Sequence, residues 1–269
     1  MPPTGQWFFI SEDMHRFYIP PAAWNLDNLT LDEAESHHAL NVLRLATGEK
    51  VVVFNGQGTE ATAQIAEGST KREIHLQVLH KAKTPPLPCR ITLAQAVPKG
   101  KNMDLIVQKA TELGATEIAP LLSERTVTKL DDGEGAAAKQ AKWQATVIEA
   151  AKQCGQNWLP SVALPRTPKD FFGSLGRGSF DLMLIASLQH DSKHLRTLLE
   201  EHATGHPNGG KPASALILVG PEGDFTPAEI GLAKSAGCQP ITLGPIVLRT
   251  ETAAIYCLSV LSYELQSGR

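Results

Sequence analysis

After Cys89 the chain alternates short apolar runs with helical stretches, and this rhythm limits the folds that are open to it. The apolar runs are ITLAQAV, EIAPLLS, SVAL, DLMLIAS, SALILVG and PITLG, and the clearest helical stretches are residues 102–114 and 139–155. Strands that are apolar on both faces and are separated by helices are typical of a parallel sheet covered on both sides. Residues 89–269 are therefore predicted to form an α/β domain built on a parallel sheet.

In the first part of the chain the apolar residues recur with a different spacing. Residues 49–82 alternate apolar and polar positions, and the turn-forming clusters NGQG and EGSTK interrupt them. The run IHLQVL places its apolar residues on one face of a strand, which is typical of antiparallel strands with one solvated face. We predict a small β-barrel over residues 14–83, a stiff proline-rich linker at 84–88, and an N-terminal extension at 1–13.

Composition excludes several classes of protein. No apolar run approaches the ~18 residues that a membrane span requires, and the N-terminus lacks the basic start of a signal peptide. The four cysteines are widely spaced without a CxxC pair, which predicts reduced thiols in a cytoplasmic protein and no metal site. A net charge of −3 argues against a generic nucleic-acid coat, so any RNA contact has to be local.

One strand-to-helix connection has the composition of a ligand-binding turn. In SALILVGPEGDFTPAEI, a buried strand ends at Val219 and a Gly-Pro-Glu-Gly turn follows. Thr226 is the expected N-cap of the next helix, Pro227 its first residue, and Glu229 completes a capping box. The loop 220–225 would lie outside the carboxyl end of a parallel strand, where such sheets bind ligands. The alternative is an ordinary turn without a ligand. The chain has neither a Walker loop nor a GxGxxG fingerprint.

A second junction, LGPIVLRTETAAIYCL at residues 243–258, carries an unusual cation. Thr250 is expected to cap the final helix, and Glu251 in its first turn suits the helix dipole. Arg249 opposes that dipole, so helix stability does not explain it. Two explanations of Arg249 stay open: a salt bridge to Glu251, or a functional role in which the side chain faces a ligand.

The two late motifs together resemble the signature pair of a known family. VGPEGDFTPAEI followed by LGPIVLRTETA resembles the RsmE family, 16S rRNA uridine-N3 methyltransferases of the SPOUT superfamily. Further similar segments, in matching order, are MHRFYIP, HHALNVLRL, PKGKNMDLIVQKATELGATEIAPLLSERTV and EAAKQCGQNWLP. The resemblance implies a PUA-like N-terminal barrel, a trefoil-knotted α/β domain, S-adenosylmethionine as methyl donor and a homodimer. It also implies small-subunit ribosomal RNA as the partner.

The resemblance places the donor site at the two bends and at the end of the DLMLIAS strand. The residues implied for cofactor binding are Ser187, Leu188, Leu218, Gly220, Pro221, Glu222, Gly223, Leu243, Gly244, Val247, Leu248 and Thr250. Methylation at uracil N3 leaves negative charge on the ring as N3 loses its proton. A guanidinium stabilises such an anion but cannot act as the base, so Arg249 is expected to face the target nucleotide. The proton acceptor is left open between Glu222, Glu251, Asp224 and water.

RNA contacts are expected from basic residues of both domains. They are His15, Arg16 and Arg44 in the barrel and Lys99, Lys101 and Lys109 at the sheet. The alternative for each is an ordinary solvated charge. Two positions depart from the family pattern: Gln156 stands where the family usually has Arg, and Asp224 stands where it usually has Gly.

The last helix is apolar almost all round, which predicts burial on more than one side. A subunit interface is the expected cover, and an entirely intrachain core is the alternative. Two other functions stay open: a non-catalytic RNA-binding or ribosome-assembly factor, and a SPOUT methyltransferase acting on a different RNA nucleotide.

Overall fold

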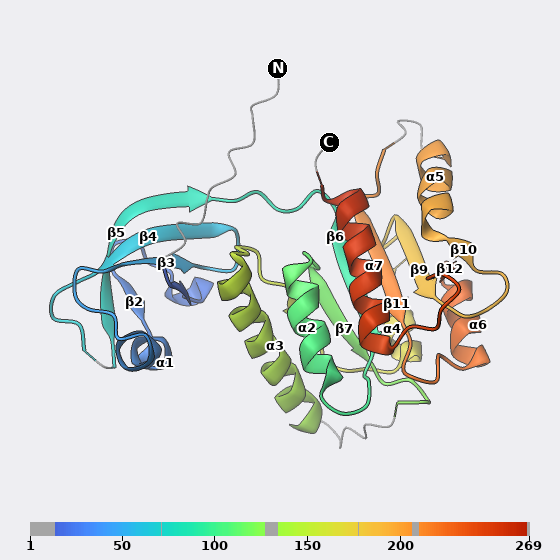
Figure 1. Cartoon of the computed structure of the whole chain (residues 1–269), viewed down its shortest axis with the longest axis horizontal. Helices are drawn as coiled ribbons and strands as arrows, with labels where there is room; N and C mark the ends of the chain where they lie inside the picture. The colour runs from blue at the N-terminus through green and yellow to red at the C-terminus, as the bar shows by residue number, and fades with distance from the viewer. Residues whose placement is uncertain (1–13, 71, 127–133, 177, 206–209, 268–269) are drawn as a thin grey trace. The chain divides into compact units, whose positions relative to one another are not determined.

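The computed structural model describes residues 14–70, 72–126, 134–176, 178–205 and 210–267 (Figure 1). The N-terminal extension predicted at 1–13 lies outside the described residues. The chain forms two compact units, Met1–Pro86 with Ala151–Leu159, and Leu87–Ala150 with Pro160–Arg269. The first division falls inside the segment predicted to be the linker. Nothing in the sequence pattern indicated that Ala151–Leu159 belongs with the first unit.

The first unit contains a five-stranded sheet. Its strands are β1 (Arg16–Tyr18), β2 (Leu29–Leu31), β3 (Lys50–Phe54), β4 (Thr59–Ile65) and β5 (Ile74–Lys83), in the order β1-β3-β4-β5-β2. All pairings are antiparallel except β1–β3. The β3–β4 turn forms because the Asn55 side chain accepts hydrogen bonds from the backbone N–H groups of Gln57 and Thr59, while Gly56 and Gly58 take positive φ.

Three short helical segments join the strands of this sheet. They are a 3₁₀ turn at Pro21–Ala23 (η1), α1 (Glu33–His37) and a π-helical turn at His38–Val42 (η2). Leu40 and Leu43 pack against the core of the unit, but Val42 is 62% exposed. A regular α-helix over this stretch would turn Val42 inward together with Leu40 and Leu43. The wider π turn changes the angle between successive side chains, and Val42 points outward instead.

The second unit is built on a seven-stranded sheet in which every pairing is parallel. Its strands are β6 (Arg90–Ala96), β7 (Glu117–Leu121), β8 (Ser161–Val162), β9 (Leu182–Ala186), β10 (Lys193–His194), β11 (Ser214–Val219) and β12 (Gln239–Thr242), in the order β10-β12-β9-β11-β6-β7-β8. β11 is buried along its whole length, as expected for a central strand covered on both faces. The parallel sheet predicted from the apolar runs is confirmed.

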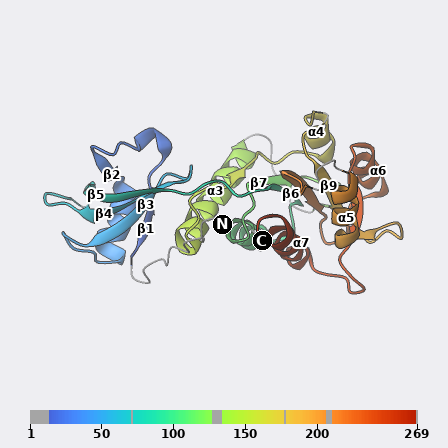
Figure 2. The same cartoon turned by 90° about the horizontal axis from the view of Figure 1, so that it is seen from above.

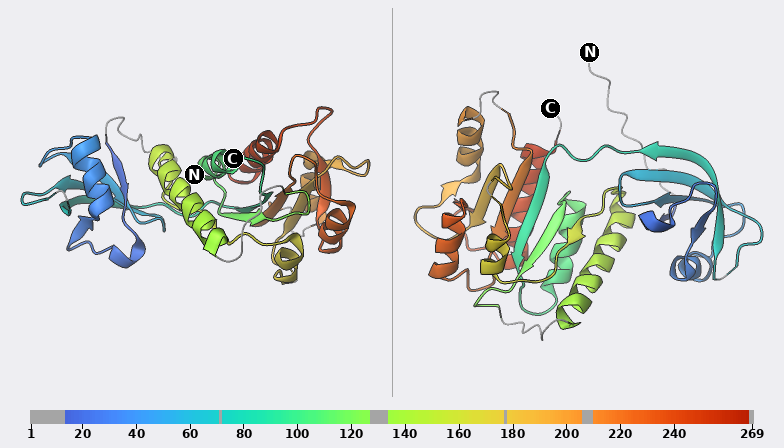
Figure 3. Two further views of the ribbon diagram at one scale, coloured as in Figure 1. Left: turned by 90° about the horizontal axis from the view of Figure 1, so that it is seen from below. Right: turned by 180° about the vertical axis from the view of Figure 1, so that it is seen from behind.

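Helices cover both faces of this sheet. They are α2 (Asn102–Glu112), α3 (Glu134–Cys154), α4 (Pro168–Gly173), α5 (Leu195–Gly205), α6 (Pro227–Ser235) and α7 (Thr250–Leu265). α2 and α7 pack together on one face, whereas α4 and α6 lie on the other (Figure 2 and Figure 3). Phe171, Phe225 and Ile230 belong to the core on the α4–α6 side. None of the described helices has the length and apolar character that a membrane crossing needs.

The strand order brings distant parts of the chain to one edge. β12, β9, β11 and β6 are consecutive neighbours in the sheet, and because they are parallel their carboxyl ends lie on the same side. The loops that follow these strands therefore meet there, although they are up to about 150 residues apart in sequence. In parallel sheets this edge is the usual ligand site.

Candidate active site

A cavity of about 550 Å³ opens at the carboxyl ends of β6, β9, β11 and β12. Both glycine-bearing bends line it, as predicted. Of the expected site residues, the following line it: Ser187, Leu188, Gly220, Pro221, Glu222, Leu243, Gly244, Val247, Leu248, Arg249, Thr250 and Glu251. Further lining residues are Lys99, Asn102, Ala186, Val219, Asp224, Ile246 and Ala253. The lining shows where these residues lie, while their roles stay predictions.

The bend after β11 is a tight turn with a left-handed residue. The backbone N–H of Asp224 donates to the carbonyl of Pro221 at 3.0 Å, and Asp224 has a φ of 60°. Glycine adopts this conformation more readily than other residues, which explains why a glycine suits position 224. An added Cβ on Gly220 would lie 3.1 Å from Asp224 Oδ1 and 3.3 Å from Phe225 N. Close packing of the turn thus favours glycine at position 220.

The predicted capping box at the start of α6 is confirmed. Thr226 accepts from the backbone of Glu229, and the Glu229 carboxylate accepts from the backbone N–H of Thr226 at 2.9 Å. Glu229 is 8% exposed and also accepts from the backbone N–H of Glu124, in the loop after β7. The guanidinium of Arg125 donates to the carbonyl of Gly223. The sequence did not predict these two hydrogen bonds from the loop after β7, because no local pattern links residues about 100 positions apart.

Two of the predicted cofactor residues do not line the cavity. Leu218 is 1% exposed and packs in the core on the α4–α6 side, because its side chain points into the sheet–helix interface. Val219, the next residue, lines the cavity instead. Gly223 is not among the lining residues, and its carbonyl faces Arg125. The structure does not bring these two residues into the lining of the cavity, and their contact with a cofactor stays a prediction.

The start of α7 also differs from expectation. Arg249 occupies the N-cap position without a side-chain cap, and Thr250 is the first helical residue. The prediction that Thr250 caps the helix is therefore wrong; its side chain is buried, with 4% of the residue exposed. Glu251 lies in the first turn, as predicted. Helix α7 thus begins without the side-chain hydrogen bond that caps α6.

Arg249 has no salt bridge or side-chain hydrogen bond with any residue that the structure describes. Glu251, the partner considered in the sequence, instead accepts from the amide of Asn102, with Asn102 Nδ2 and Glu251 Oε2 3.2 Å apart. Arg249 is exposed and lines the cavity. Its guanidinium is therefore available to a ligand, since neither dipole nor ion pair accounts for its position.

Two further carboxylates, Glu222 and Asp224, line the cavity. Glu222 Oε1 accepts from the backbone N–H of Lys99 at 2.9 Å, and Asp224 Oδ1 accepts from that of Phe225 at 2.7 Å. Within the described residues no group of three or more His, Cys, Asp or Glu side chains could hold a metal ion. The site therefore combines carboxylates, one free guanidinium and glycine-rich backbone.

The buried thiols are not suited to nucleophilic chemistry. Burial raises the pKa of Cys257 and of Cys238 to about 12, and that of Cys89 to about 11. These thiols stay protonated near neutral pH, and the thiolate is the nucleophilic form. No cysteine is among the described residues that line the cavity.

Comparisons with known proteins agree with this geometry. A family model described as an RNA methyltransferase domain matches residues 85–262, and one described as an RNA methyltransferase PUA domain matches residues 31–79. The ribosomal RNA small subunit methyltransferase E of Synechocystis is 34% identical over 94% of this chain and 78% of its own. The chain belongs to the RsmE family of ribosomal RNA small subunit methyltransferases.

Two solved relatives carry the cofactor expected for the RsmE family. A methyltransferase from Legionella pneumophila, in complex with S-adenosylmethionine, is 34% identical with a TM-score of 0.81, covering 93% of this chain and 98% of its own. Ribosomal RNA small subunit methyltransferase E from Neisseria gonorrhoeae, bound to S-adenosylmethionine, is 31% identical with a TM-score of 0.78 and the same coverage. Of the predicted fold class, a PUA-like barrel followed by a trefoil-knotted SPOUT domain, the PUA-like first sheet and the parallel sheet of the SPOUT domain are confirmed, and the knot stays a prediction.

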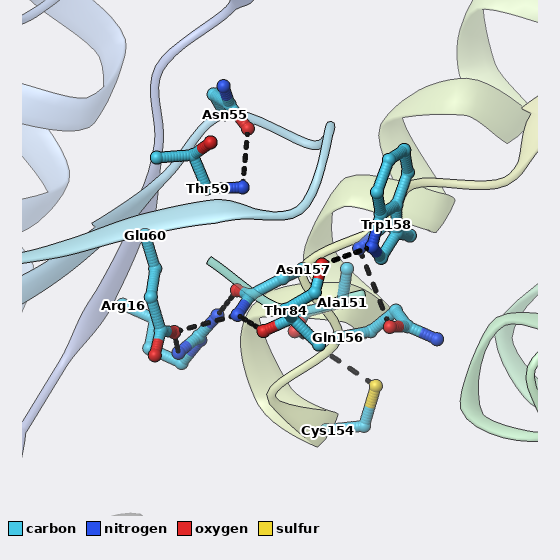
Figure 4. A network of polar contacts seen from close by, with 10 residues as sticks. All are labelled: Arg16, Asn55, Thr59, Glu60, Thr84, Ala151, Cys154, Gln156, Asn157 and Trp158. Atoms are coloured by element: carbon cyan, nitrogen blue, oxygen red, sulfur yellow. Dashed lines mark hydrogen bonds and ion pairs between the residues drawn. The ribbon is translucent and has the colours of Figure 1, made fainter. Parts of the chain in front are cut away.

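One RNA-contact residue expected from the RsmE resemblance is engaged inside the first unit. The Arg16 side chain is 8% exposed and forms an ion pair with Glu60 at 3.1 Å. Its guanidinium also donates to Asn157 Oδ1 at 2.6 Å (Figure 4). The guanidinium carbon lies 5.0 Å from the centroid of the Phe54 ring. These contacts leave the Arg16 guanidinium little access to RNA. They favour a structural role for Arg16, and its contact with RNA stays a prediction.

The other basic candidates differ in availability. His15, Arg44, Lys99 and Lys101 are exposed. Lys109 is partly buried and pairs with Glu112 at 2.8 Å on the same helix. Their contacts with RNA stay predictions, with Lys109 the weakest of the group.

Gln156, which departs from the RsmE family pattern, lies in the same polar network as Arg16. Its side-chain carbonyl accepts from the backbone N–H of Trp158 at 3.4 Å. Asn157 beside it is 5% exposed and donates to Glu60 and Thr84, both at 2.9 Å (Figure 4). Asn157 is one of several contacts of segment 151–159 within the first unit, together with the hydrogen bond from Trp158 Nε1 to the Thr84 carbonyl and the Lys152–Glu35 ion pair.

Proposed function

We propose that the protein methylates N3 of a uridine in the 16S RNA of the small ribosomal subunit, with S-adenosylmethionine as the methyl donor. The proposal rests chiefly on one observation. In a member of the RsmE family, the two glycine-bearing bends line a single cavity, and the one cation at the second bend, Arg249, is without a partner among the described residues.

The lining of the cavity fits this donor. Its volume, about 550 Å³, falls within the range of roughly 300–1,000 Å³ that small-molecule sites occupy. Three carboxylates line it, which suits a ligand that carries a sulfonium and an ammonium group, and Leu188, Val219 and Leu248 offer an apolar wall to adenine. When bound, S-adenosylmethionine supplies an electrophilic methyl group.

The residues of this chain would prepare the acceptor. Uracil N3 has to lose its proton, and the resulting negative charge is shared with O2 and O4. Arg249 would donate to those oxygens and stabilise the anion, since its fixed donors match such a charge. Because Glu251 is held by Asn102, Glu222 and Asp224 are the carboxylates to test as proton acceptors, with water as the third candidate.

The assembly and the surroundings of the enzyme form part of the proposal. One side of α7 packs against α2, β6 and β11, while Tyr256 and Tyr263 on the same helix are 48% and 73% exposed. We propose that a second copy covers these tyrosines in a homodimer, and that the enzyme works in the cytoplasm on ribosomal RNA. Light scattering on the wild type and on Tyr263→Glu tests the dimer, and a monomeric wild type would contradict it.

The decisive experiment is primer extension on 16S RNA. N3 methylation blocks the Watson–Crick edge, so reverse transcriptase stops at the modified base. A strain lacking the gene should lose one stop, and complementation should restore it. An unchanged pattern of stops would refute the uridine-N3 assignment. Calorimetry with S-adenosylmethionine then separates a different target nucleotide, in which the donor still binds, from a non-catalytic RNA-binding factor, in which it does not.

A further inference from the structure

The loop after β6 is attached to both bends of the cavity. The backbone N–H of Lys99 donates to Glu222, in the bend after β11. The side chain of Asn102 donates to Glu251, in the first turn of α7. Both residues also line the cavity. Two residues only three positions apart, Lys99 in the loop and Asn102 at the start of α2, thus hold two carboxylates that come from separate parts of the chain.

The contact of Asn102 has a consequence for Arg249. Glu251 is two positions after Arg249, at the start of the same helix. It is the carboxylate nearest to Arg249 in sequence and is partly exposed, so a weak Arg–Glu ion pair can form when nothing else holds either group. Asn102 occupies Glu251 Oε2, and Arg249 is left without an ion pair among the described residues.

We propose that Asn102 is a positioning residue that keeps the Glu251 carboxylate away from Arg249 and so leaves the guanidinium available to the nucleotide. The part of this inference that concerns methyl transfer to the nucleotide rests on the proposed function. An amide suits this task because it donates a hydrogen bond without a charge of its own. A lysine or arginine at position 102 would hold Glu251 as well, but would add a second cation beside the acceptor.

The availability of Arg249 can be measured without methylation. Phenylglyoxal modifies accessible arginines, and peptide mass spectrometry reports the rate at Arg249. In Asn102→Ala, Glu251 is released to pair with Arg249, and the rate should fall about two- to fivefold, as expected for an exposed ion pair. In the double variant Asn102→Ala/Glu251→Gln the pair cannot form, and the rate should return to the wild-type value.

The matched control is Asp104→Asn, in the same turn of α2. It removes an ion pair with Lys142 that lies outside the cavity lining, and the rate at Arg249 should not change. Equal rates in wild type and Asn102→Ala would overturn the inference, as would a fall that Glu251→Gln does not reverse. The latter would mean that Asn102 acts only through the stability of the loop.

Turnover provides the second measurement. In Asn102→Ala, kcat for methylation should fall by the same factor as the phenylglyoxal rate, while the Kd for S-adenosylmethionine stays the same. A rise in Kd at constant kcat would contradict the assigned role. If the wild type methylates no RNA, the proposed function fails, whereas the phenylglyoxal comparison still decides whether Asn102 controls Arg249.

Discussion

The two bends that line the cavity are held in different ways. In the bend after β11, Asp224, Glu222 and the carbonyl of Gly223 each have a hydrogen-bond partner, and a capping box fixes the helix that follows. In the bend after β12, Ile246 and Val247 are each 73% exposed. The side-chain contact there joins Thr242 Oγ1 to the backbone N–H of Gly244 at 3.2 Å.

The bend after β11 is therefore held by the protein itself, whereas the bend after β12 is completed by the ligands that cover it. Hydrogen bonds to Glu222, Gly223 and Asp224, together with the capping box, hold the first bend in place before anything binds. Exposed apolar side chains on the second bend gain free energy only when a ligand, RNA or another chain covers them. We therefore expect substitutions in the first bend to change stability and donor affinity together, and substitutions in the second to act mainly on ligand-dependent steps.

The largest effect is expected at the end of the second bend, in Arg249→Ala. Loss of a donor to the developing anion should lower methyl transfer by about 10²–10³-fold. The Kd for S-adenosylmethionine should stay within about twofold and the melting temperature should not change, because Arg249 has no partner among the described residues. Single-turnover methylation and calorimetry measure these quantities. A loss of donor binding would instead place Arg249 in the cofactor site.

The next effect concerns the first bend, in Gly220→Ala. The added Cβ would lie 3.3 Å from the Asp224 Cα and the Phe225 nitrogen, which are backbone atoms that cannot yield without moving the turn. We expect a loss of about 1–3 kcal/mol in the free energy of unfolding and a donor Kd raised about tenfold. Chemical denaturation and calorimetry measure the two.

Gly231→Ala is the matched control for this substitution. Gly231 lies inside α6, and an added Cβ there meets no atom within 4 Å. Alanine should stabilise the helix by about 0.5–1 kcal/mol, with no change in donor affinity. If both alanine variants behaved alike, close packing would not be the reason for Gly220.

A smaller effect is expected for Gly244→Ala in the second bend. Gly244 has a φ of 109°, and an added Cβ meets nothing within 4 Å, so the strain comes from the backbone alone. Because the surrounding bend is exposed and can yield, the free energy of unfolding should fall by about 1 kcal/mol, at the low end for such strain. Donor affinity should fall more than stability does. Equal losses in both would show that this bend is as fixed as the first.

The sequence was sufficient for features whose partners are close along the chain. The Thr226–Glu229 capping box spans four residues, and the parallel sheet follows from the length and spacing of apolar runs. The carboxyl ends of parallel strands pointed to the loop 220–225 as a ligand site, whereas only the resemblance to the RsmE family joined the second bend to it. Thr250 was misassigned because a threonine before a helix is a common cap, and only the backbone shows that the helix begins one residue earlier.

Contacts between distant residues could not be predicted from one sequence. Arg16 pairs with residues 44 and 141 positions away, and Asn102 with one 149 positions away. A basic side chain that pairs inside the fold has the same sequence signature as one that meets RNA. The contacts of Asn102 and Arg125 could not be predicted from the sequence either, because the strand order decides which residues lie beside them.

The smallest effect should come from Asp224→Gly, which tests why the first bend tolerates an aspartate. Glycine relieves a left-handed conformation that costs other residues roughly 1–2 kcal/mol, but it removes the hydrogen bond from Phe225 N, worth about 0.5–1.5 kcal/mol. The two changes offset each other, so stability should stay within about 1 kcal/mol. Asp224→Ala loses the hydrogen bond and keeps the strain, so it should be the least stable of the three proteins. If the glycine variant were as unstable as the alanine variant in chemical denaturation, the carboxylate rather than the backbone angle would fix this bend.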